Sequence, residues 1–448
     1  MDVHPGPTID EFGRLLRRGE TTTEAATTTC LERIEALNAR LRALILVLGD
    51  EALEQARQAD RDLAAGLDRG PLHGVPLTIK DLIDVRGTPT TAASRVREHH
   101  LARQDAPVVT RLREAGAILV GKANLHEFAF GTTNEDSAFG AARNPIDPSR
   151  SPGGSSGGSA ASIVSGMALA SVGTDTGGSI RIPSAACGIV GLKPTHGELP
   201  LEGVVPLSPT LDHLGPITQT VTDAWLLYHA LAGRPAASSL RPAPVRGLRL
   251  AIPRRYFCDT LDDEVRERFE AAITAMRAAG ATVTDTDIPV AEDGAAIYLH
   301  IVLSEAAAYH AATLDALPHR YSPAVRQRLE MGRYVLAEDY LRALAGRDVL
   351  RSQVDAAVSA VDALVLPTLP IVAPPIGAAT VRIGASEQPV RNLMLRLTQT
   401  FNLSGHPALS LPCGHTPAGL PCGLQIVGAR SQTERLLAVA AGIEGLLA

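Results

Sequence analysis

Residues 1–69 show the alternation of apolar and polar positions that is typical of amphipathic helices. Apolar side chains recur three or four positions apart, at Phe12, Leu15, Leu16, Cys30, Ile34 and Leu37. Thr8 stands three positions before Glu11, which is the spacing of a capping box. Thr21 and Glu24 repeat that spacing. The pattern therefore predicts two helices, and a third is predicted over residues 51–65.

After residue 70 the pattern changes to short apolar runs separated by helical segments. The runs cover residues 75–79, 117–120, 189–192, 248–252, 281–283 and 363–367. Helical patterns lie between them, for example over residues 107–115 and 262–279. The second of these begins at the N-cap residue Asp262 and stops at Gly280. This rhythm predicts an α/β fold in which helices cover a sheet.

The remaining segments complete a single predicted domain over residues 1–448. Residues 290–360 are helical again, and within them residues 320–354 are expected to form paired helices that cap a site. Residues 361–448 return to short apolar runs and end in a helix. No repeat or low-complexity linker separates these regions from the core at residues 70–230.

Composition and charge narrow the class of protein. Hydrophobic residues make up 45% and charged residues 20%, as in an ordinary globular protein. The net charge of −6 argues against a nucleic-acid partner. We expect no signal peptide and no membrane span, and residues 159–172 are interpreted as a buried helix. Five scattered cysteines predict reduced thiols in a cytoplasmic protein.

The candidate chemistry lies in residues 151–183, which read SPGGSSGGSAASIVSGMALASVGTDTGGSIRIP. Two clusters of glycine and serine flank an apolar stretch. Glycine allows a positive φ and close approach, so such clusters can direct several backbone N–H groups at one point. That arrangement suits an anion, either a phosphate or the oxyanion of an acyl-transfer reaction.

Two alternatives use only one of the clusters. A Walker loop requires Lys after the last glycine, but Ser159 follows Gly158, and no strand precedes the cluster as a dinucleotide fingerprint requires. The segment from Gly153 to Gly157 matches G-x-S-x-G, the nucleophile elbow of α/β-hydrolases, with Ser155 as nucleophile. A polar segment with two prolines stands where the elbow's strand belongs. The histidines that this reading would use as a base are His196, His213 and His406.

A third interpretation joins both clusters to a lysine. A serine hydroxyl is a weak nucleophile and needs a base. A desolvated lysine can be neutral near neutral pH and can serve as that base. In GPLHGVPLTIKD, Lys80 ends a short apolar strand, where a lysine is more often a surface residue. Beside the two clusters, Lys80 becomes a candidate base.

Several long motifs resemble those of the amidase-signature family. They are GPLHGVPLTIKD, GGSSGGSAAS and GTDTGGSIRIPSAACGIVGLKPT, with KANLHEFAFG, RNPIDPSR, LDHLGPIT, FNLSGHPALSLP and GLPCGLQIVG in the same order. The resemblance covers about residues 70–428. The family includes bacterial amidases, indoleacetamide hydrolase and the glutaminase subunit of tRNA-dependent amidotransferase. It implies a large mixed β-sheet covered by helices on both sides, with a helical cap.

The resemblance also implies the roles of the site residues. Ser179 is expected to be the nucleophile, Ser155 the bridging serine reached through a cis peptide bond, and Lys80 the general base. The implied oxyanion hole and supporting residues are Thr176, Gly177, Gly178, Ser156, Asp175 and Arg181. The substrate pocket is expected to include Phe128, Phe130, Ile180 and Phe401, although core packing is nearly as good an interpretation for these side chains.

These residues predict a serine amidohydrolase that needs neither metal nor cofactor. The expected substrates are small or aryl carboxamides, with carbamates (urethanes) and esters as further candidates, because the same tetrahedral chemistry serves them. The first alternative is a glutaminase-like subunit of a tRNA-dependent amidotransferase, and the second is a Ser-His-Asp hydrolase that uses Ser155. The expected partner is a small-molecule substrate, and the expected assembly is a monomer or homodimer.

Overall fold

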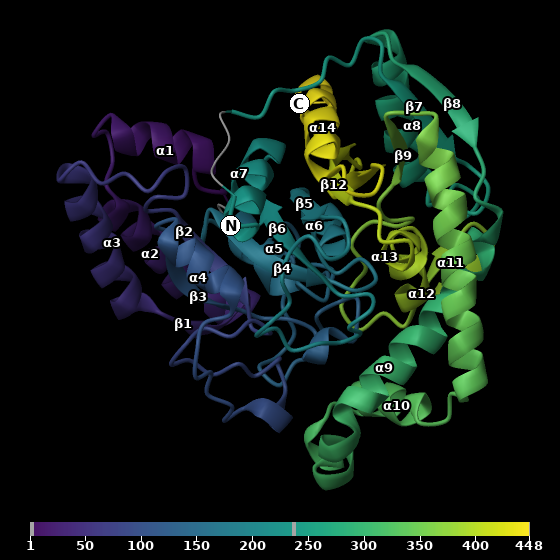
Figure 1. The fold of residues 1–448 in the computed structure, drawn as a ribbon, viewed down its shortest axis with the longest axis horizontal. Coiled ribbons are helices and arrows are strands. Elements are labelled where there is room, and N and C mark those ends of the chain that lie inside the picture. Colours follow the sequence, from purple (N-terminus) through teal and green to yellow (C-terminus); the bar gives the residue numbers. More distant parts are fainter. Residues whose placement is uncertain (1–3, 235–238, 448) are drawn as a thin grey trace.

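An eleven-stranded sheet forms the centre of the protein. The computed structural model describes residues 4–234 and 239–447. In spatial order the strands are β1 (Leu44–Val47), β3 (Ile118–Ala123), β2 (Pro76–Lys80), β4 (Ala170–Asp175), β6 (His213–Thr218), β5 (Val190–Lys193), β12 (Ala408–His415), β13 (Pro421–Val427), β9 (Ala363–Pro367), β7 (Arg249–Pro253) and β8 (Thr282–Thr286). Figure 1 shows the sheet running from β1 at the left to β8 at the right.

The sheet is mixed, with parallel pairs toward its two ends. β2 pairs in parallel with both β3 and β4, and β7 pairs in parallel with both β8 and β9. The strands between them, from β4 through β6, β5, β12 and β13 to β9, pair antiparallel. A parallel pair needs a crossover, which α4 supplies between β2 and β3 and α8 supplies between β7 and β8.

Helices cover both faces of the sheet, and seven of its strands are therefore buried along their whole length. Every residue of β2, β3, β4, β5, β6, β9 and β13 is buried. The helices are α1 (Ile9–Arg17), α2 (Thr23–Leu41), α3 (Gly49–Ala64), α4 (Pro107–Glu114), α5 (Gly157–Val164), α6 (Arg181–Cys187), α7 (Val221–Leu231), α8 (Asp263–Ala278), α9 (Gly294–Ala316), α10 (Pro323–Gly332), α11 (Ala337–Ser359), α12 (Val390–Arg396), α13 (Gln399–Leu403) and α14 (Thr433–Leu447). The predicted α/β class is confirmed.

Three long helices form the region predicted to cap a site. α9 packs against both α10 and α11. In Figure 1, α9 and α10 extend below the sheet, and α11 runs along the right side. A separate two-stranded hairpin, β10 (Thr380–Ile383) with β11 (Ser386–Pro389), leads into α12. The cap region and the hairpin therefore lie outside the eleven-stranded sheet.

Most predicted elements form, but two details of the prediction are wrong. Residues 159–172 were expected to be one buried helix, yet α5 ends at Val164 and β4 begins at Ala170. Gly166, with φ of 72°, supports the turn between them. The second helix is capped by Thr22, whose hydroxyl accepts from Ala25 N at 3.0 Å, rather than by Thr21. All five cysteines are free thiols.

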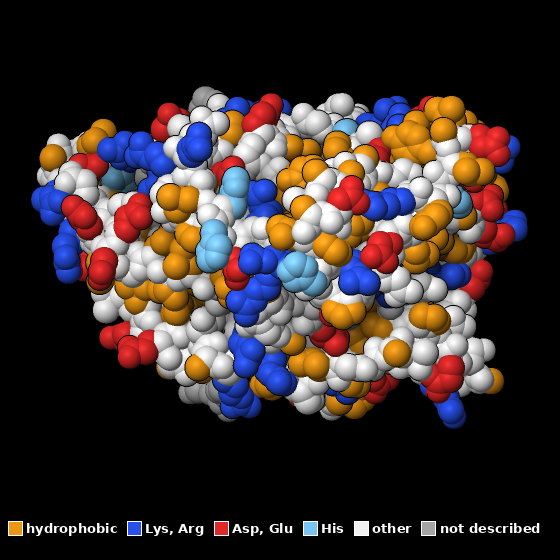
Figure 2. All heavy atoms as spheres, turned by 90° about the horizontal axis from the view of Figure 1, so that it is seen from below, with side chains coloured by type: hydrophobic (Ala, Val, Ile, Leu, Met, Phe, Trp, Pro, Cys, Tyr) orange, Lys and Arg blue, Asp and Glu red, His pale blue; other side chains and the backbone are white. Residues whose placement is uncertain are grey.

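None of the helices in the described residues is both long and apolar enough to cross a bilayer. On the face seen in Figure 2, Lys and Arg side chains form a band near the middle, and acidic and apolar side chains are scattered around it.

Candidate active site

The sheet brings the two glycine- and serine-rich loops to one edge. Lys80 ends β2 and Asp175 ends β4, and because these strands are parallel their carboxyl ends lie side by side. Ser155 lies in the loop before α5, and Ser179 lies in the turn between β4 and α6. Segments far apart in the chain thus meet at the end of β2.

Lys80 is fully buried, and within the described residues its Nζ forms hydrogen bonds only with hydroxyl groups. Its Nζ donates to Ser155 Oγ and to Thr174 Oγ1, each at 2.7 Å. Burial lowers the pKa of Lys80 to about 7, although the charges of Asp175 and Asp212 oppose that shift. A large fraction of Lys80 is therefore neutral near pH 7, which is the condition for it to accept a proton.

Ser155 is held by backbone contacts on both sides. The Gly154–Ser155 peptide bond is cis, and Ser155 O accepts from His126 N at 3.0 Å. A Cβ at Gly154 would stand 2.8 Å from Asn134 N, so only glycine fits against this neighbouring loop. The close packing fixes Ser155 in front of Lys80.

Ser156 and Ser179 connect the two loops. Ser156 N donates to Ser179 O at 3.2 Å, and Ser156 Oγ donates to Thr174 O at 3.2 Å. Ser179 is 6% exposed. Its hydroxyl forms no hydrogen bond with another group in the described part of the chain, so the second link of the expected relay, from Ser155 to Ser179, stays a prediction.

The backbone of residues 176–178 is shaped by its neighbours. Gly178 has φ of 139°, and a Cβ there would stand 2.2 Å from Thr398 Oγ1. Thr398 Oγ1 in turn donates to Gly177 O at 2.6 Å, and Thr176 Oγ1 donates to Asp212 Oδ1 at 2.5 Å. Within the described residues the N–H groups of Gly177 and Gly178 donate to no protein acceptor, as an oxyanion hole requires.

The expected pair between Asp175 and Arg181 forms beneath this turn. Both side chains are fully buried, with Arg181 Nη2 2.9 Å and Nε 3.1 Å from the Asp175 carboxylate. Burial alone would raise the pKa of Asp175, but the charge and hydrogen bonds of Arg181 bring it well below its ordinary value. Asn402 Oδ1, Gln425 Oε1 and the carbonyl of Thr398 accept the remaining Arg181 N–H groups, at 2.7, 2.6 and 3.0 Å. The turn thus rests on a saturated network.

The four side chains expected to line a pocket lie in the protein interior. Ile180 is fully buried in a small apolar cluster with α5 residues, and Phe401 stacks on Phe257 at 6.0 Å. Phe128 packs edge-on against His310, and Phe130 lies under the guanidinium of Arg328. The structure therefore gives Ile180 and Phe401 a packing role, and a part for any of the four in substrate binding stays a prediction.

The geometry does not support the nucleophile elbow. Residues 151–156 form no strand, and Ser155 Oγ contacts a lysine rather than a histidine. His213 Nδ1 lies 2.7 Å from Leu211 O, and His406 Nε2 lies 3.1 Å from an Asp355 oxygen. Both rings are therefore engaged elsewhere.

Sequence reasoning missed several residues that support the site. Thr174 contacts Lys80, Asp212 holds Thr176, and Asn402 Nδ2 donates to Asp175 Oδ1 at 2.7 Å. Each of these polar residues stands within a motif that the sequence analysis quoted. Thr174 lies in GTDTGGS, Asp212 in LDHLGPIT and Asn402 in FNLSG. Their partners, however, are distant in the chain.

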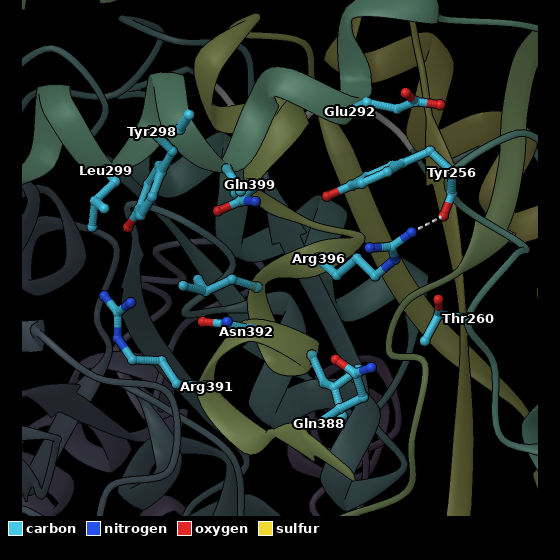
Figure 3. Close-up of a pocket in the computed structure, with 14 residues that line it drawn as sticks. Tyr256, Thr260, Glu292, Tyr298, Leu299, Gln388, Arg391, Asn392, Arg396 and Gln399 are labelled. Carbon is cyan, nitrogen blue, oxygen red and sulfur yellow. Dashed lines mark hydrogen bonds between the residues drawn. The ribbon is translucent and has the colours of Figure 1, made fainter. Parts of the chain in front are cut away.

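A cavity of about 470 Å³ adjoins the turn of residues 176–179. Tyr298 from α9 and Leu395 from α12 line it, and both also pack against Gly177. In Figure 3, Arg391 and Tyr298 lie on one side of the cavity, and Tyr256 and Arg396 lie on the other. The cavity offers space beside the expected oxyanion hole.

The fold and these loops place the protein among the mixed α/β enzymes, and comparison with known proteins identifies the family. The Amidase family model matches residues 25–437, so the chain belongs to the amidase-signature family. The A subunit of glutamyl-tRNA(Gln) amidotransferase from Heliobacterium modesticaldum is 36% identical over 474 residues, covering 98% of this chain and 96% of that protein.

Solved structures of enzymes share the whole fold. The crystal structure of an amidase is 40% identical with a TM-score of 0.93, covering 99% of this chain and all (100%) of that one. A peptide amidase in complex with the competitive inhibitor chymostatin is 31% identical with a TM-score of 0.85, covering 98% and 97% of the two chains. The protein is therefore an amidase-family amidohydrolase.

Proposed function

We propose that this protein hydrolyses amide-type C–N bonds through an acyl-enzyme on Ser179, with Ser155 as proton relay and Lys80 as base. The observation that carries the proposal is the contact of a fully buried lysine with Ser155 Oγ at 2.7 Å. Burial without a carboxylate in contact lowers the pKa of Lys80 to about 7, so the side chain can take a proton at neutral pH.

In the proposed reaction, neutral Lys80 accepts the proton of Ser155 while Ser155 accepts that of Ser179. Ser179 Oγ forms a bond to the substrate carbonyl carbon, whose π electrons move to oxygen. The C–N bond then breaks, and the proton returns through Ser155 to the leaving amine. Water, activated by the same relay, cleaves the ester and restores the free Ser179 hydroxyl.

The N–H groups of residues 176–178 would stabilise the oxyanion. Loss of one such donor in other acyl-transfer enzymes slows the reaction by about 10²–10³. The contacts of Thr398 with Gly177 O and of Asp212 with Thr176 would keep these donors in place, because they fix the turn from both sides. Thr398 and Asp212 are thus positioning residues in this scheme.

The proposed substrates are small or aryl carboxamides, with carbamates and esters as further candidates. A second candidate function is that of a glutaminase subunit in a tRNA-dependent amidotransferase. The observation in its favour is the likeness, along almost the whole chain, to the A subunits of two glutamyl-tRNA(Gln) amidotransferases, at 36% and 38% identity. That role would require glutamine as the amide donor and partner subunits.

The test compares the wild type with Ser179→Ala on primary amides, anilides, aryl carbamates, esters and glutamine, with ammonia and arylamine release both measured. We expect turnover by the wild type and its loss in Ser179→Ala. Ser410→Ala is the matched control, because Ser410 on β12 is also buried but bonds to Thr368, just after β9 and outside the site. Retained turnover in Ser179→Ala would overturn the proposal, and activity on glutamine alone would favour the amidotransferase role.

A further inference from the structure

Arg391 is a cation that the protein itself leaves without a counter-charge. It lines the cavity of Figure 3 from α12, and its Nε is buried without a hydrogen-bond acceptor. Among the described residues it forms no ion pair and no hydrogen bond. Burial lowers the pKa of Arg391, and Tyr298 rather than a carboxylate opposes that shift. Arg391 is half-buried, and a buried Nε–H without an acceptor is costly, so a ligand anion beside the guanidinium would relieve that cost.

The other charged groups of the cavity are already engaged. Arg396 donates to Tyr256 O at 2.8 Å, and its guanidinium lies 4.0 Å from the centre of the Tyr256 ring. The carboxylate of Glu292 is 2.8 Å from Arg255 Nε. Among the described residues, Arg391 therefore differs from Glu292, whose charge is paired, and from Arg396, which has a carbonyl acceptor and an aromatic ring although its Nε also lacks a partner.

A second cation adds to the positive field around Arg391. Burial, together with the charge of Arg391, lowers the pKa of Arg328 to about 10. Arg328 Nη1 donates to the carbonyl of Phe130 at 2.6 Å. The charge of Asp136 offsets part of that of Arg328, but a carbonyl acceptor does not neutralise it, so an anion near Arg391 would be attracted by both side chains.

The cavity lies beside the expected oxyanion hole. A Cβ at Gly177 would stand 2.6 Å from Tyr298 Oη and 2.9 Å from Leu395 Cδ2, both of which line the cavity. Figure 3 shows the Tyr298 hydroxyl and the Arg391 guanidinium on the same side of the space. A group bound by Arg391 would therefore lie in a cavity whose wall contacts the turn that carries Ser179.

We propose that Arg391, with the Tyr298 hydroxyl as a second donor, binds a carboxylate on the acyl part of the substrate. The preferred substrates are then monoamides of dicarboxylic acids rather than wholly apolar amides. A planar guanidinium matches the two oxygens of a carboxylate. This inference rests on the proposed amide hydrolysis and narrows its substrate class.

The experiment measures kcat and KM of the wild type and Arg391→Met on the monoamides of succinic, glutaric and adipic acid. Each is paired with the neutral amide in which an isopropyl group replaces the carboxylate. We expect the wild type to prefer the best monoamide over its neutral analogue by at least about tenfold, and Arg391→Met to lose about 10–100-fold in kcat/KM on that monoamide alone. The loss should fall mainly on KM, and Arg391→Lys should restore part of it.

Arg347→Met is the matched control. Arg347 is also a partly buried arginine whose Nε has no hydrogen-bond partner, but it lies on α11 away from this cavity. Its substitution should leave the carboxylate preference unchanged. Calorimetric titration of Ser179→Ala with the glutaric monoamide provides a second measurement that needs no turnover. We expect binding there and its loss in Ser179→Ala/Arg391→Met.

Three results would overturn the inference while leaving the proposed function intact. The first is equal hydrolysis of charged and neutral amides by the wild type. The second is an unchanged carboxylate preference in Arg391→Met. The third is absence of binding to Ser179→Ala in the titration. Failure of the proposed function itself would be recognised separately, as hydrolysis of neutral amides that survives in Ser179→Ala.

Discussion

Two fully buried lysines on neighbouring strands have opposite surroundings. Lys80 ends β2 and contacts the hydroxyls of Ser155 and Thr174. Lys122, on the adjacent strand β3, lies 2.9 Å from the carboxylate of Asp81 and donates to the carbonyl of Pro89 at 3.1 Å. The two side chains share residue type, depth and strand geometry, and differ in whether a carboxylate is in contact.

The presence or absence of a neighbouring carboxylate distinguishes a lysine suited to proton transfer from a lysine that stabilises the fold. A buried ammonium that meets a carboxylate is stabilised as an ion pair. A buried ammonium that meets only hydroxyls is destabilised and tends to lose its proton, as the lowered pKa of Lys80 indicates. Burial alone therefore does not mark a base, and the first neighbours of the nitrogen decide the role.

Activity should distinguish the two lysines most strongly. We expect Lys80→Met to lower kcat by about 10²–10⁴, because a positioned general base contributes that much. Lys122→Met should retain most of the wild-type kcat at a temperature where circular dichroism shows it folded. Amide hydrolysis under saturating substrate provides the measurement. Wild-type activity in Lys80→Met would contradict the proposal that Lys80 is the general base.

Stability should show the reverse order. Lys122→Met leaves Asp81 buried without its partner, so we expect the free energy of unfolding to fall by about 3–5 kcal/mol. Lys80→Met removes a poorly solvated ammonium that has no carboxylate in contact, so the stability should be unchanged or higher. Urea unfolding at pH 7, followed by fluorescence or circular dichroism, compares the two variants. A larger loss in Lys80→Met would contradict this expectation.

The pH dependence is the smallest and most specific effect. Because only neutral Lys80 can accept a proton, kcat/KM should rise about tenfold per pH unit below pH 7 and level off above it. Asp212 raises the pKa of Lys80, so Asp212→Asn should move this limb to lower pH. The measurement uses a substrate that does not titrate between pH 5 and 9. A flat profile between pH 6 and 9, with chemistry rate-limiting, would argue against Lys80 as base.

Local patterns predicted elements well where one chain segment carried the whole signal. The apolar run at residues 363–367 is β9, and the Asp262 cap starts α8 by accepting from Glu264 N. The prediction failed where an apolar stretch contained two elements, as in residues 159–172, because apolar content alone does not distinguish a short helix followed by a strand from one longer helix.

In the candidate active site, too, local motifs indicated some residues and not others. The resemblance of the motifs to those of the amidase-signature family singled out Lys80, Ser155 and Ser179 as candidates, whereas the glycine and serine clusters alone also allowed a phosphate site or a nucleophile elbow. The motifs did not indicate Thr174 as the second acceptor of Lys80, nor Asn402 as a donor to Asp175. Hydrogen bonds over 94 and 227 positions depend on strand order and helix placement, which periodicity does not specify.

By itself, the sequence determined the α/β class and the absence of a basic surplus, because periodicity and charge are local properties. Its motifs indicated the residues of the candidate chemistry through their resemblance to the amidase-signature family. Only the tertiary structure decided which buried lysine meets a carboxylate and which arginine stays unpaired beside the cavity. Those are matters of distance between segments far apart in the chain, and the free energy of a buried charge depends on the atoms within a few ångströms of it.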